Sequence, residues 1–288
     1  MKFSADVSEI KYIMNKYGFT FKKGLGQNFL YDEQTLEKIA AAGKSDGVIE
    51  IGPGFGSLTR ILARNYEKVV SIEADDRLIP ILGDILAEYD NVRIIHNDCM
   101  KVNFPELIET EFSGKSVSVA ANLPYYITTP IISMLLENKL PLKKIVITVQ
   151  KEVADRIAAA PGGKEYGAFS VMCQYYSKPK IIAKIPASLF TPPPKVDSAA
   201  VLLEVCAVPN VSTVSEKMFF KTVRAAFAQR RKTLLNALAN GSFGISKNDI
   251  GDILTDAGIN PAARGETLSL EEFSAIADRI YSRTEITK

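Results

Sequence analysis

The tetrad Asn122-Leu123-Pro124-Tyr125 offers three groups that suit recognition of a planar base. It directly follows the apolar run 117–121, which has the composition of a buried strand. Asn122 supplies an amide oxygen, Pro124 a constrained backbone carbonyl, and Tyr125 an aromatic face. Two acceptors beside a ring fit a base with an exocyclic amino group. Asn and Pro are also common in turns at strand ends, so the tetrad alone leaves both interpretations open.

A glycine-rich turn at 50–56 lies between a predicted strand at 48–51 and a predicted helix at 57–65. Gly52 and Gly54 allow a sharp turn and close approach of a ligand because they carry no Cβ. Glu73 ends the next predicted strand, where a carboxylate can accept both hydroxyls of a ribose. Asp98 follows the third predicted strand, and its carboxylate fits either an adenine amino group or a helix N-cap.

Two kinds of ligand could bind at this turn, a nicotinamide dinucleotide or S-adenosylmethionine. The spacing is G-x-G-x-G rather than G-x-G-x-x-G, and Pro53 lacks the N–H that a pyrophosphate would bind. Glu50 adds a negative charge that repels phosphate and suits a cation. Since S-adenosylmethionine carries a sulfonium, an ammonium and no phosphate, the turn favours this methyl donor.

The composition limits which partners, metal sites and catalytic groups the protein can have. The 288 residues are 47% hydrophobic and 24% charged, and the formal net charge is +2, so a polyanion would need a local basic patch. The three cysteines are far apart without metal-type spacing, and the single His96 argues against zinc chemistry and histidine catalysis. We expect a reduced, cytoplasmic protein with no metal, no secretory signal and no membrane partner. The charge-free stretch 116–136 is interpreted as a buried strand and a core helix.

Strands and helices are predicted to alternate between residues 48 and 149, which is typical of a mostly parallel, doubly wound sheet. Two later strands, at 181–185 and 199–205, fit an antiparallel edge on that sheet. From about residue 215 only helices are predicted. We therefore expect an α/β fold in residues 1–208 and a small all-helical domain in residues 209–288. The parallel strands should bring their carboxyl ends to one crevice, lined by Gly52, Glu73, Asp98 and Asn122.

Taken together, these motifs resemble the rRNA adenine N6,N6-dimethyltransferase family, of the small-subunit dimethyladenosine transferase type. The segments that carry the resemblance are 26–30, 50–56, 122–125, 150–153, 190–198 and 229–233. Each motif alone is moderately specific, whereas all of them in this order are highly specific. The resemblance implies a Rossmann-like class I S-adenosylmethionine-dependent methyltransferase sheet with a helical RNA-binding domain.

Site residues follow from the resemblance by position. It implies that Asn28 and Leu30 contact the methyl donor from an N-terminal arm, with the rest of the donor site formed by Gly52, Gly54, Glu73, Asp98 and Asn122. It also implies a target-base site formed by Asn122, Leu123, Pro124 and Tyr125, with Phe190 on the other face of the base.

The implied reaction is N6,N6-dimethylation of two adjacent adenosines in a hairpin near the 3′ end of 16S rRNA, within an immature small subunit. We expect the enzyme to act as a monomer. One alternative is a macrolide-resistance type methylase of 23S rRNA, which shares the tetrad. Another is an assembly factor that binds RNA and is largely non-catalytic. The segments 192–198 and 229–233 favour the first interpretation over the 23S enzyme.

A basic segment near the C-terminus is the predicted RNA contact. Residues 217–232 include no acidic residue and contain Lys217, Lys221, Arg224, Arg230, Arg231 and Lys232. If they form one continuous helix, all but Arg230 fall within about a third of its circumference. Such a stripe suits phosphates, although a merely solvated face is the common alternative. Lys22 and Lys23, beside the arm, are predicted to extend the patch.

Overall fold

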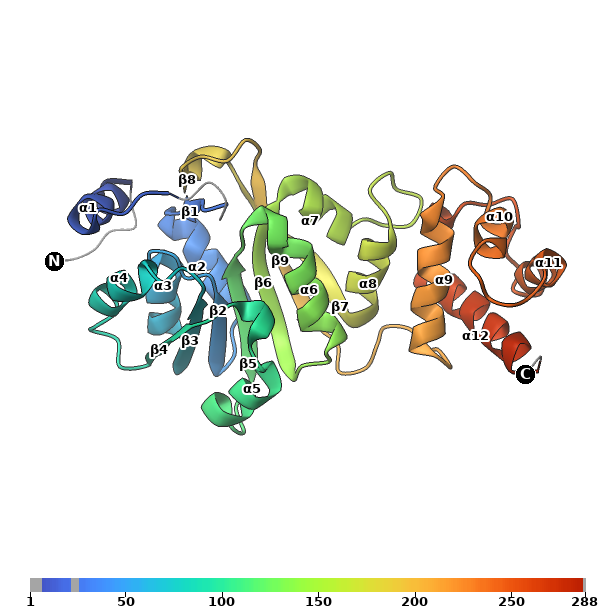
Figure 1. Ribbon diagram of the computed structural model, residues 1–288, viewed down its shortest axis with the longest axis horizontal. Coiled ribbons are helices and arrows are strands. Elements are labelled where there is room, and N and C mark those ends of the chain that lie inside the picture. Colours follow the sequence, from blue (N-terminus) through green and yellow to red (C-terminus); the bar gives the residue numbers. More distant parts are fainter. Residues whose placement is uncertain (1–6, 22–25, 287–288) are drawn as a thin grey trace. The chain divides into compact units, whose positions relative to one another are not determined.

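The computed structural model describes residues 7–21 and 26–286, and it divides into two compact units (Figure 1). The first, here the sheet unit, comprises Met1–Ala154 and Lys178–Val205. The second, here the helical unit, comprises Asp155–Ser177 and Cys206–Lys288. The predicted division between 208 and 209 follows the order of the chain, whereas the compact units also group 155–177 with the C-terminal helices. Aromatic packing explains this grouping, because Tyr175 and Tyr176 contact the ring of Phe220.

The sheet unit is built on seven strands in the order β4-β3-β2-β5-β6-β9-β7 (Figure 1). Their bounds are β2 (Gly47–Ile51), β3 (Lys68–Glu73), β4 (Val92–His96), β5 (Val117–Asn122), β6 (Leu142–Gln150), β7 (Ser177–Ile185) and β9 (Ser198–Val205). Strands β2 to β6 pair in parallel, and β9 pairs antiparallel with β6. The predicted doubly wound sheet with an antiparallel edge is confirmed.

Helices cover the sheet, so the central strands are buried and mostly apolar. Every residue of β2 is buried, as is β5 up to Ala121. The sheet unit contains the helices α2 (Glu33–Ala42), α3 (Ser57–Asn65), α4 (Leu78–Ile85), α5 (Phe104–Phe112) and α6 (Thr128–Glu137), and α7 (Lys151–Ile157) spans the boundary between the two units. Helix α3 begins where predicted, and its N-cap is Gly56 in the left-handed conformation, with φ of 75°.

An additional small sheet joins two distant segments. Strand β1 (Phe29–Leu30) pairs antiparallel with β8 (Phe190–Thr191), which places Leu30 opposite Phe190. Helix α1 (Val7–Tyr17) precedes β1, and Phe19, Phe29 and Phe55 form a ring cluster with centroid separations of 5.0 and 4.4 Å. The sequence analysis had not predicted this pairing. It fixes the segment before α2 against the proline-rich connection between β7 and β9.

The helical unit contains α8 (Ala168–Tyr176), α9 (Glu216–Ala228), α10 (Leu234–Ala239), α11 (Lys247–Asp256) and α12 (Leu270–Ile286). The prediction of one continuous helix over 217–232 is wrong, since α9 ends at Ala228. Gln229 adopts φ of −136°, outside the helical region, and the chain turns before α10. The turn lets Leu234 and Leu238 bury themselves in a second helix, and the Leu234 N–H donates to the Ala263 carbonyl at 2.7 Å.

No helix in the described part of the chain is long and apolar enough to cross a membrane. The charge-free stretch 116–136 forms the buried strand β5, the short 3-10 helix η3 (Tyr125–Ile127) and most of α6, which confirms its interpretation as core. Three further 3-10 turns are η2 (Cys99–Lys101), η4 (Ala187–Leu189) and η5 (Gly265–Thr267).

Candidate active site

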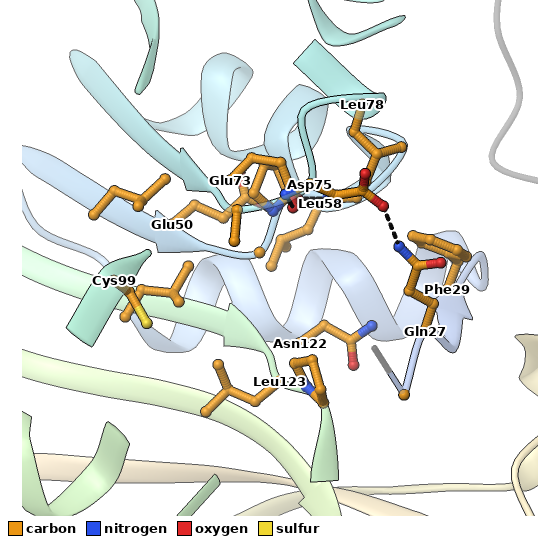
Figure 2. Close-up of a pocket in the computed structure, with 18 of the residues that line it drawn as sticks. Gln27, Phe29, Glu50, Leu58, Glu73, Asp75, Leu78, Cys99, Asn122 and Leu123 are labelled. Carbon is orange, nitrogen blue, oxygen red and sulfur yellow. Dashed lines mark hydrogen bonds between the residues drawn. The ribbon is translucent and has the colours of Figure 1, made fainter. Parts of the chain in front are cut away.

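A cavity of about 340 Å³ lies at the carboxyl ends of β2, β3 and β5 (Figure 2). Parallel strands of a doubly wound sheet end at the same edge, so residues far apart in the sequence meet there. All residues predicted to bind the methyl donor line this cavity, namely Asn28, Leu30, Gly52, Gly54, Glu73, Asp98 and Asn122. Its volume falls within the range of small-molecule sites.

The glycine turn leaves no room for a side chain at Gly54. Gly54 has φ of +59°, and a Cβ there would lie 2.5 Å from a ring carbon of Phe29. The Glu73 carboxylate braces this turn by accepting hydrogen bonds from the Gly54 N–H at 3.2 Å and the Asp75 N–H at 2.8 Å. Burial raises the pKa of Glu73, although these N–H groups favour its charged form. The carboxyl end of β3 and the glycine turn are therefore fixed to each other.

Glu50 lies beneath the same turn and is 1% exposed. Its carboxylate accepts hydrogen bonds from the Thr59 hydroxyl at 2.6 Å and the Ser71 hydroxyl at 2.8 Å. Burial raises the pKa of Glu50 to about 7, the two hydroxyls oppose that rise, and the nearby Glu73 adds to it. Near neutral pH this buried group can therefore gain or lose a proton in response to a charged ligand.

The lining of the cavity is strongly acidic. Four carboxylates line it, those of Glu50, Glu73, Asp75 and Asp98, and no Lys, Arg or His is among the described lining residues. The ionised members of this set attract a cation and repel a phosphate, although the ion pair with Arg77 already offsets the charge of Asp75. Asp98 also acts as the N-cap of η2, accepting from the Met100 N–H at 3.0 Å.

The segment 26–30, here the arm, is anchored beside the cavity (Figure 2). The Gln27 amide donates to the Asp75 carboxylate at 2.9 Å, and Arg77 forms an ion pair with the same carboxylate at 2.5 Å. Burial would raise the pKa of Asp75, but the hydrogen bonds from Arg77 and Gln27 hold it below its usual value. Arg77 also donates to the Thr20 carbonyl at 2.9 Å, which ties the chain before the arm to the sheet unit.

Asn122 connects the arm with the predicted target-base tetrad. Its side-chain N–H donates to the Asn28 carbonyl at 3.0 Å. Because the amide nitrogen is used in this way, the amide oxygen is the group left to accept a hydrogen bond from a ligand. Leu123 and Pro124 line the cavity as well, so three of the four residues of the tetrad face it.

The remaining groups predicted for the target base already have partners within the protein. The Pro124 carbonyl accepts from the Ile127 N–H at 3.1 Å and from the Thr128 hydroxyl at 3.3 Å. The Tyr125 hydroxyl shares a hydrogen bond with the Ser198 hydroxyl at 2.7 Å, and Tyr125 does not line the cavity. Phe190 is 2% exposed and packs in the core cluster with Leu30, so it does not line the cavity either.

Tyr126 was not singled out from the sequence, yet it lines the cavity and is 64% exposed. The available signal was the pair of consecutive tyrosines after Pro124. In a 3-10 turn, neighbouring side chains point about 120° apart. If the side chain of Tyr125 points into the protein interior, the side chain of Tyr126 must therefore point in another direction.

The predicted basic stripe is only partly present. Lys217, Lys221 and Arg224 lie at helical spacing on α9, and Lys217 and Arg224 are exposed. Lys221 donates to the Ser242 carbonyl at 2.7 Å and lies 4.9 Å from the centre of the Phe243 ring.

Three of the predicted cations lie beyond the end of α9. Arg230 donates to the Lys164 carbonyl at 2.7 Å and pairs with Glu266 at 3.1 Å. Arg231 and Lys232 are exposed in the turn. Lys22 and Lys23 fall outside the described residues.

Residues 7–21 and 26–286 contain no group of three or more His, Cys, Asp or Glu side chains that could hold a metal ion. The three cysteines form no disulfide, and Cys99 lines the cavity. Burial raises the pKa of the Cys99 thiol to about 11, and Asp98 contributes to the rise. A neutral thiol of this kind is a poor nucleophile.

Comparisons with known proteins agree with these features. The sequence model of the family described as Ribosomal RNA adenine dimethylase matches residues 18–281. The chain is 50% identical over 275 residues to a protein of Shouchella clausii named Ribosomal RNA small subunit methyltransferase A, covering 94% of this chain and 93% of that protein. It is 47% identical to a protein of the same name from Alkaliphilus oremlandii over 276 residues, 95% of this chain and 96% of that one.

Solved structures share the fold. A dimethyladenosine transferase from Plasmodium falciparum has a TM-score of 0.68 and 26% identity, covering 86% of this chain and 95% of that one. The 23S rRNA methyltransferase ErmE has a TM-score of 0.69 and 24% identity, covering 88% of this chain and 99% of that one. At that identity, the second likeness concerns the fold alone.

Proposed function

Because the chain belongs to the ribosomal RNA adenine dimethylase family, we propose that it dimethylates N6 of two adjacent adenosines in a hairpin near the 3′ end of 16S rRNA. The methyl donor is S-adenosylmethionine, and the RNA is presented within an immature small subunit. Relatives that are 47% to 50% identical over nearly the whole chain are named for the small subunit, which supports this substrate over 23S rRNA. The observation that carries the proposal is that Asn122 lines a cavity whose wall contains glycines and acidic side chains.

The cavity fits the donor by its charge and by its shape. Its lining holds four carboxylates and no cationic side chain, which suits a ligand with positive groups and no phosphate. Gly52 and Gly54 have positive φ angles and let the backbone approach the ligand closely. Glu73 would accept hydrogen bonds from the ribose hydroxyls, and Asp98 from the adenine amino group. Asn28 and Leu30 would contact the donor from the arm.

When bound, S-adenosylmethionine supplies an electrophilic methyl group on a positively charged sulfur. The N6 amino group of adenine is a weak nucleophile because its lone pair is delocalised into the ring. The protein would therefore act mainly by holding the amino group in line with the donor, an effect that can account for much of the acceleration. The single histidine, His96, is not among the residues that line the cavity. A solvent water can accept the proton after transfer, so no general base is required.

Asn122 is the proposed acceptor for the first N6 hydrogen. Its side-chain nitrogen is held by the Asn28 carbonyl, so its oxygen is oriented as an acceptor before the base arrives. A fixed acceptor at this position would pull electron density toward N6 and stabilise the positive charge that develops there. The arm thereby takes part in positioning the target amino group.

The Pro124 carbonyl is the proposed acceptor for the second N6 hydrogen. One of its two present donors, the Thr128 hydroxyl, lies at the longer distance of 3.3 Å and can rotate away. The N–H of Ile127, at 3.1 Å, belongs to the backbone of the 3-10 turn and stays in place. One lone pair of the carbonyl thus becomes free for the base without any change in the backbone.

Tyr125 and Phe190 are the proposed stacking partners of the extruded base. In the RNA-free protein Tyr125 is bonded to Ser198 and Phe190 is buried beside Leu30. Entry of the base would require these rings to exchange protein contacts for stacking on the base, which is worth roughly 1–3 kcal/mol per base. Base extrusion itself costs a few kcal/mol, so stacking of this size offsets much of the cost.

RNA phosphates would bind Lys217, Arg224, Arg231 and Lys232 in the helical unit, where these side chains are exposed. Arg230 and Lys221 have protein partners and would contribute less. The predicted contribution of Lys22 and Lys23 stays a part of this proposal. Affinity of this kind falls steeply with salt, so an RNA affinity that does not respond to salt would contradict it.

The test is to incubate the protein with a labelled methyl donor and immature small or large subunits, and then to map the modified bases. The proposal predicts label on N6 of two adjacent adenosines near the 3′ end of 16S rRNA. Label on 23S rRNA would overturn the substrate assignment. Tight binding to small subunits without any label would indicate an assembly factor instead of an enzyme.

A further inference from the structure

Two consecutive tyrosines follow Pro124 and have opposite environments. Tyr125 is partly buried, and its hydroxyl is bonded to Ser198 at 2.7 Å. Tyr126 is 64% exposed, and its hydroxyl has no hydrogen-bond partner within the described ranges 7–21 and 26–286. Both belong to the 3-10 turn η3, which separates successive side chains by about 120°.

Tyr126 also lies at the rim of the cavity. It is one of the lining residues, and its large exposure shows that it stands where the cavity meets solvent. A large aromatic side chain at this place exposes a flat apolar face to solvent, and a planar base can stack on such a face.

The inner edge of the Tyr126 ring is supported by the arm. A Cβ built on Gly26 would lie 3.3 Å from one ring carbon of Tyr126 and 3.5 Å from another. Gly26, whose φ is +58°, thus leaves space that the ring occupies. With its inner edge held by backbone, the ring presents its outer part to solvent as a pre-oriented flat surface.

We infer that Tyr126 positions the substrate by stacking on a base next to the target adenosine. This inference rests on the proposed function, in which two adjacent adenosines are modified and one neighbour of the target is itself a substrate. Extruding a base into the cavity unstacks it from its neighbour, which then exposes an aromatic face at the rim. An exposed tyrosine is the kind of platform on which single-stranded bases stack without sequence readout.

The assignment differs from that of Tyr125, which serves the base inside the site. Tyr126 would hold the flanking nucleotide and keep the second adenosine close to the cavity after the first has been modified. It is a positioning residue, since it touches neither the reacting nitrogen nor the donor's methyl group. Its contribution should therefore appear in the capture of RNA rather than in the affinity for the donor.

The experiment compares the wild-type protein with Tyr126→Leu and Tyr126→Phe on immature small subunits. Leucine keeps an apolar contact with Gly26 but lacks the aromatic face. We expect Tyr126→Leu to lower kcat/KM for the subunit on the order of tenfold, mainly through KM, because one stacked base is lost. Tyr126→Phe should restore most of that loss. The dissociation constant of S-adenosylmethionine, measured by calorimetry without RNA, should be unchanged in both variants.

Tyr12→Leu is the matched control, because Tyr12 is 50% exposed on α1 and does not line the cavity. It should behave as the wild type does. The inference is overturned if Tyr126→Leu keeps wild-type kcat/KM, or if its loss is matched by an equal loss of donor affinity, which would mean that the ring only supports the arm. Failure of the wild-type protein to modify either subunit would contradict the proposed function itself.

Discussion

The candidate active site has two halves, one proposed to bind the methyl donor and one proposed to bind the target base. The two halves differ in how their polar groups are hydrogen-bonded. In the donor half, Glu50 and Glu73 each accept two hydrogen bonds from groups of the sheet unit, and the Gly54 N–H of the glycine turn is one of the donors to Glu73. In the target-base half, the Pro124 carbonyl and the Tyr125 hydroxyl are bonded to the protein itself. The donor half is therefore open and braced, whereas the target-base half must exchange bonds before a base can enter.

The difference follows from the elements that carry each half. Long parallel strands position the donor half, and their ladders of backbone hydrogen bonds fix where each strand ends. A 3-10 turn and the two-residue strand β8 carry the target-base half. Short elements of this kind rearrange at low cost. A preformed donor site beside an adaptable base site suits an enzyme whose large substrate is a ribosomal particle.

The largest effect is expected from Asn122→Ala, which removes the acceptor shared by both halves. Loss of one preorganised group at a developing charge typically costs about 10²- to 10³-fold in rate. Single-turnover methyl transfer at saturating donor should fall by that amount. Donor affinity should be measured on the same variant, because Asn122 also lines the donor cavity.

Asn138→Ala is a suitable control for this variant, since Asn138 is an exposed residue at the end of α6. Near-normal transfer by Asn122→Ala would remove the proposed mechanism. A loss explained wholly by weaker donor binding would assign Asn122 to the donor half alone.

Glu73→Gln is expected to have a smaller effect, and only on the affinity for the methyl donor. The amide keeps the size of the side chain but loses the negative charge that favours a cationic ligand. It also loses one of the two carboxylate oxygens that accept hydrogen bonds from the N–H groups of Gly54 and Asp75. Donor affinity should fall on the order of tenfold, in line with the loss of a charged hydrogen bond. Glu67→Gln, at an exposed pair with Lys115, should leave the affinity unchanged. Equal affinities in both variants would contradict the bracing role of Glu73.

Donor binding should depend on pH through Glu50. Burial raises the pKa of this carboxyl to about 7, so below that pH it is largely protonated and neutral. A cationic donor favours the ionised form, so its affinity should decrease as the pH falls below about 7 and level off above it. S-adenosylhomocysteine, which lacks the sulfonium, should respond less.

Calorimetric titrations between about pH 5.5 and 8.5 would measure this dependence. Glu50→Gln should flatten the profile, although the nearby Glu73, whose pKa is also raised by burial, can leave a residual slope. A profile that is unchanged in Glu50→Gln would show that another group binds the proton.

The smallest effect is expected from Thr128→Val. This change removes the hydroxyl that donates to the Pro124 carbonyl at 3.3 Å and nearly preserves the side-chain shape. Because the base would displace that hydrogen bond anyway, transfer should stay within about threefold of wild type, a difference of well under 1 kcal/mol. A loss of more than tenfold in single-turnover rate would mean that the hydroxyl itself supports catalysis.

The sequence could predict that the residues proposed for the donor half meet at one cavity, because the signals that place them are local. Apolar runs bounded by glycine or carboxylate residues mark where strands end, and the parallel topology then brings Gly52, Glu73 and Asn122 together. The pairing of β1 with β8 joins two-residue segments that lie far apart in the chain. No periodicity can appear in strands of that length, so this pairing was not predictable.

Two other features depended on tertiary context. Helix α9 ends at Ala228, and the C-cap residue Gln229 is neither glycine nor proline, so the sequence lacks the usual stop signal and predicts a continuous basic helix. Tyr125 and Tyr126 are chemically identical neighbours, and only the bond from Tyr125 to Ser198 decides which of them faces the cavity rim. The local sequence does not contain that information.

The most direct test of the contrast between the two halves is calorimetric titration of the RNA-free protein with S-adenosylmethionine. If the donor half is complete in the absence of RNA, the donor should bind in a one-to-one ratio, and adding small subunits should change its affinity little. A protein that binds the donor only after small subunits are present would contradict the account, because both halves would then depend on RNA for their assembly.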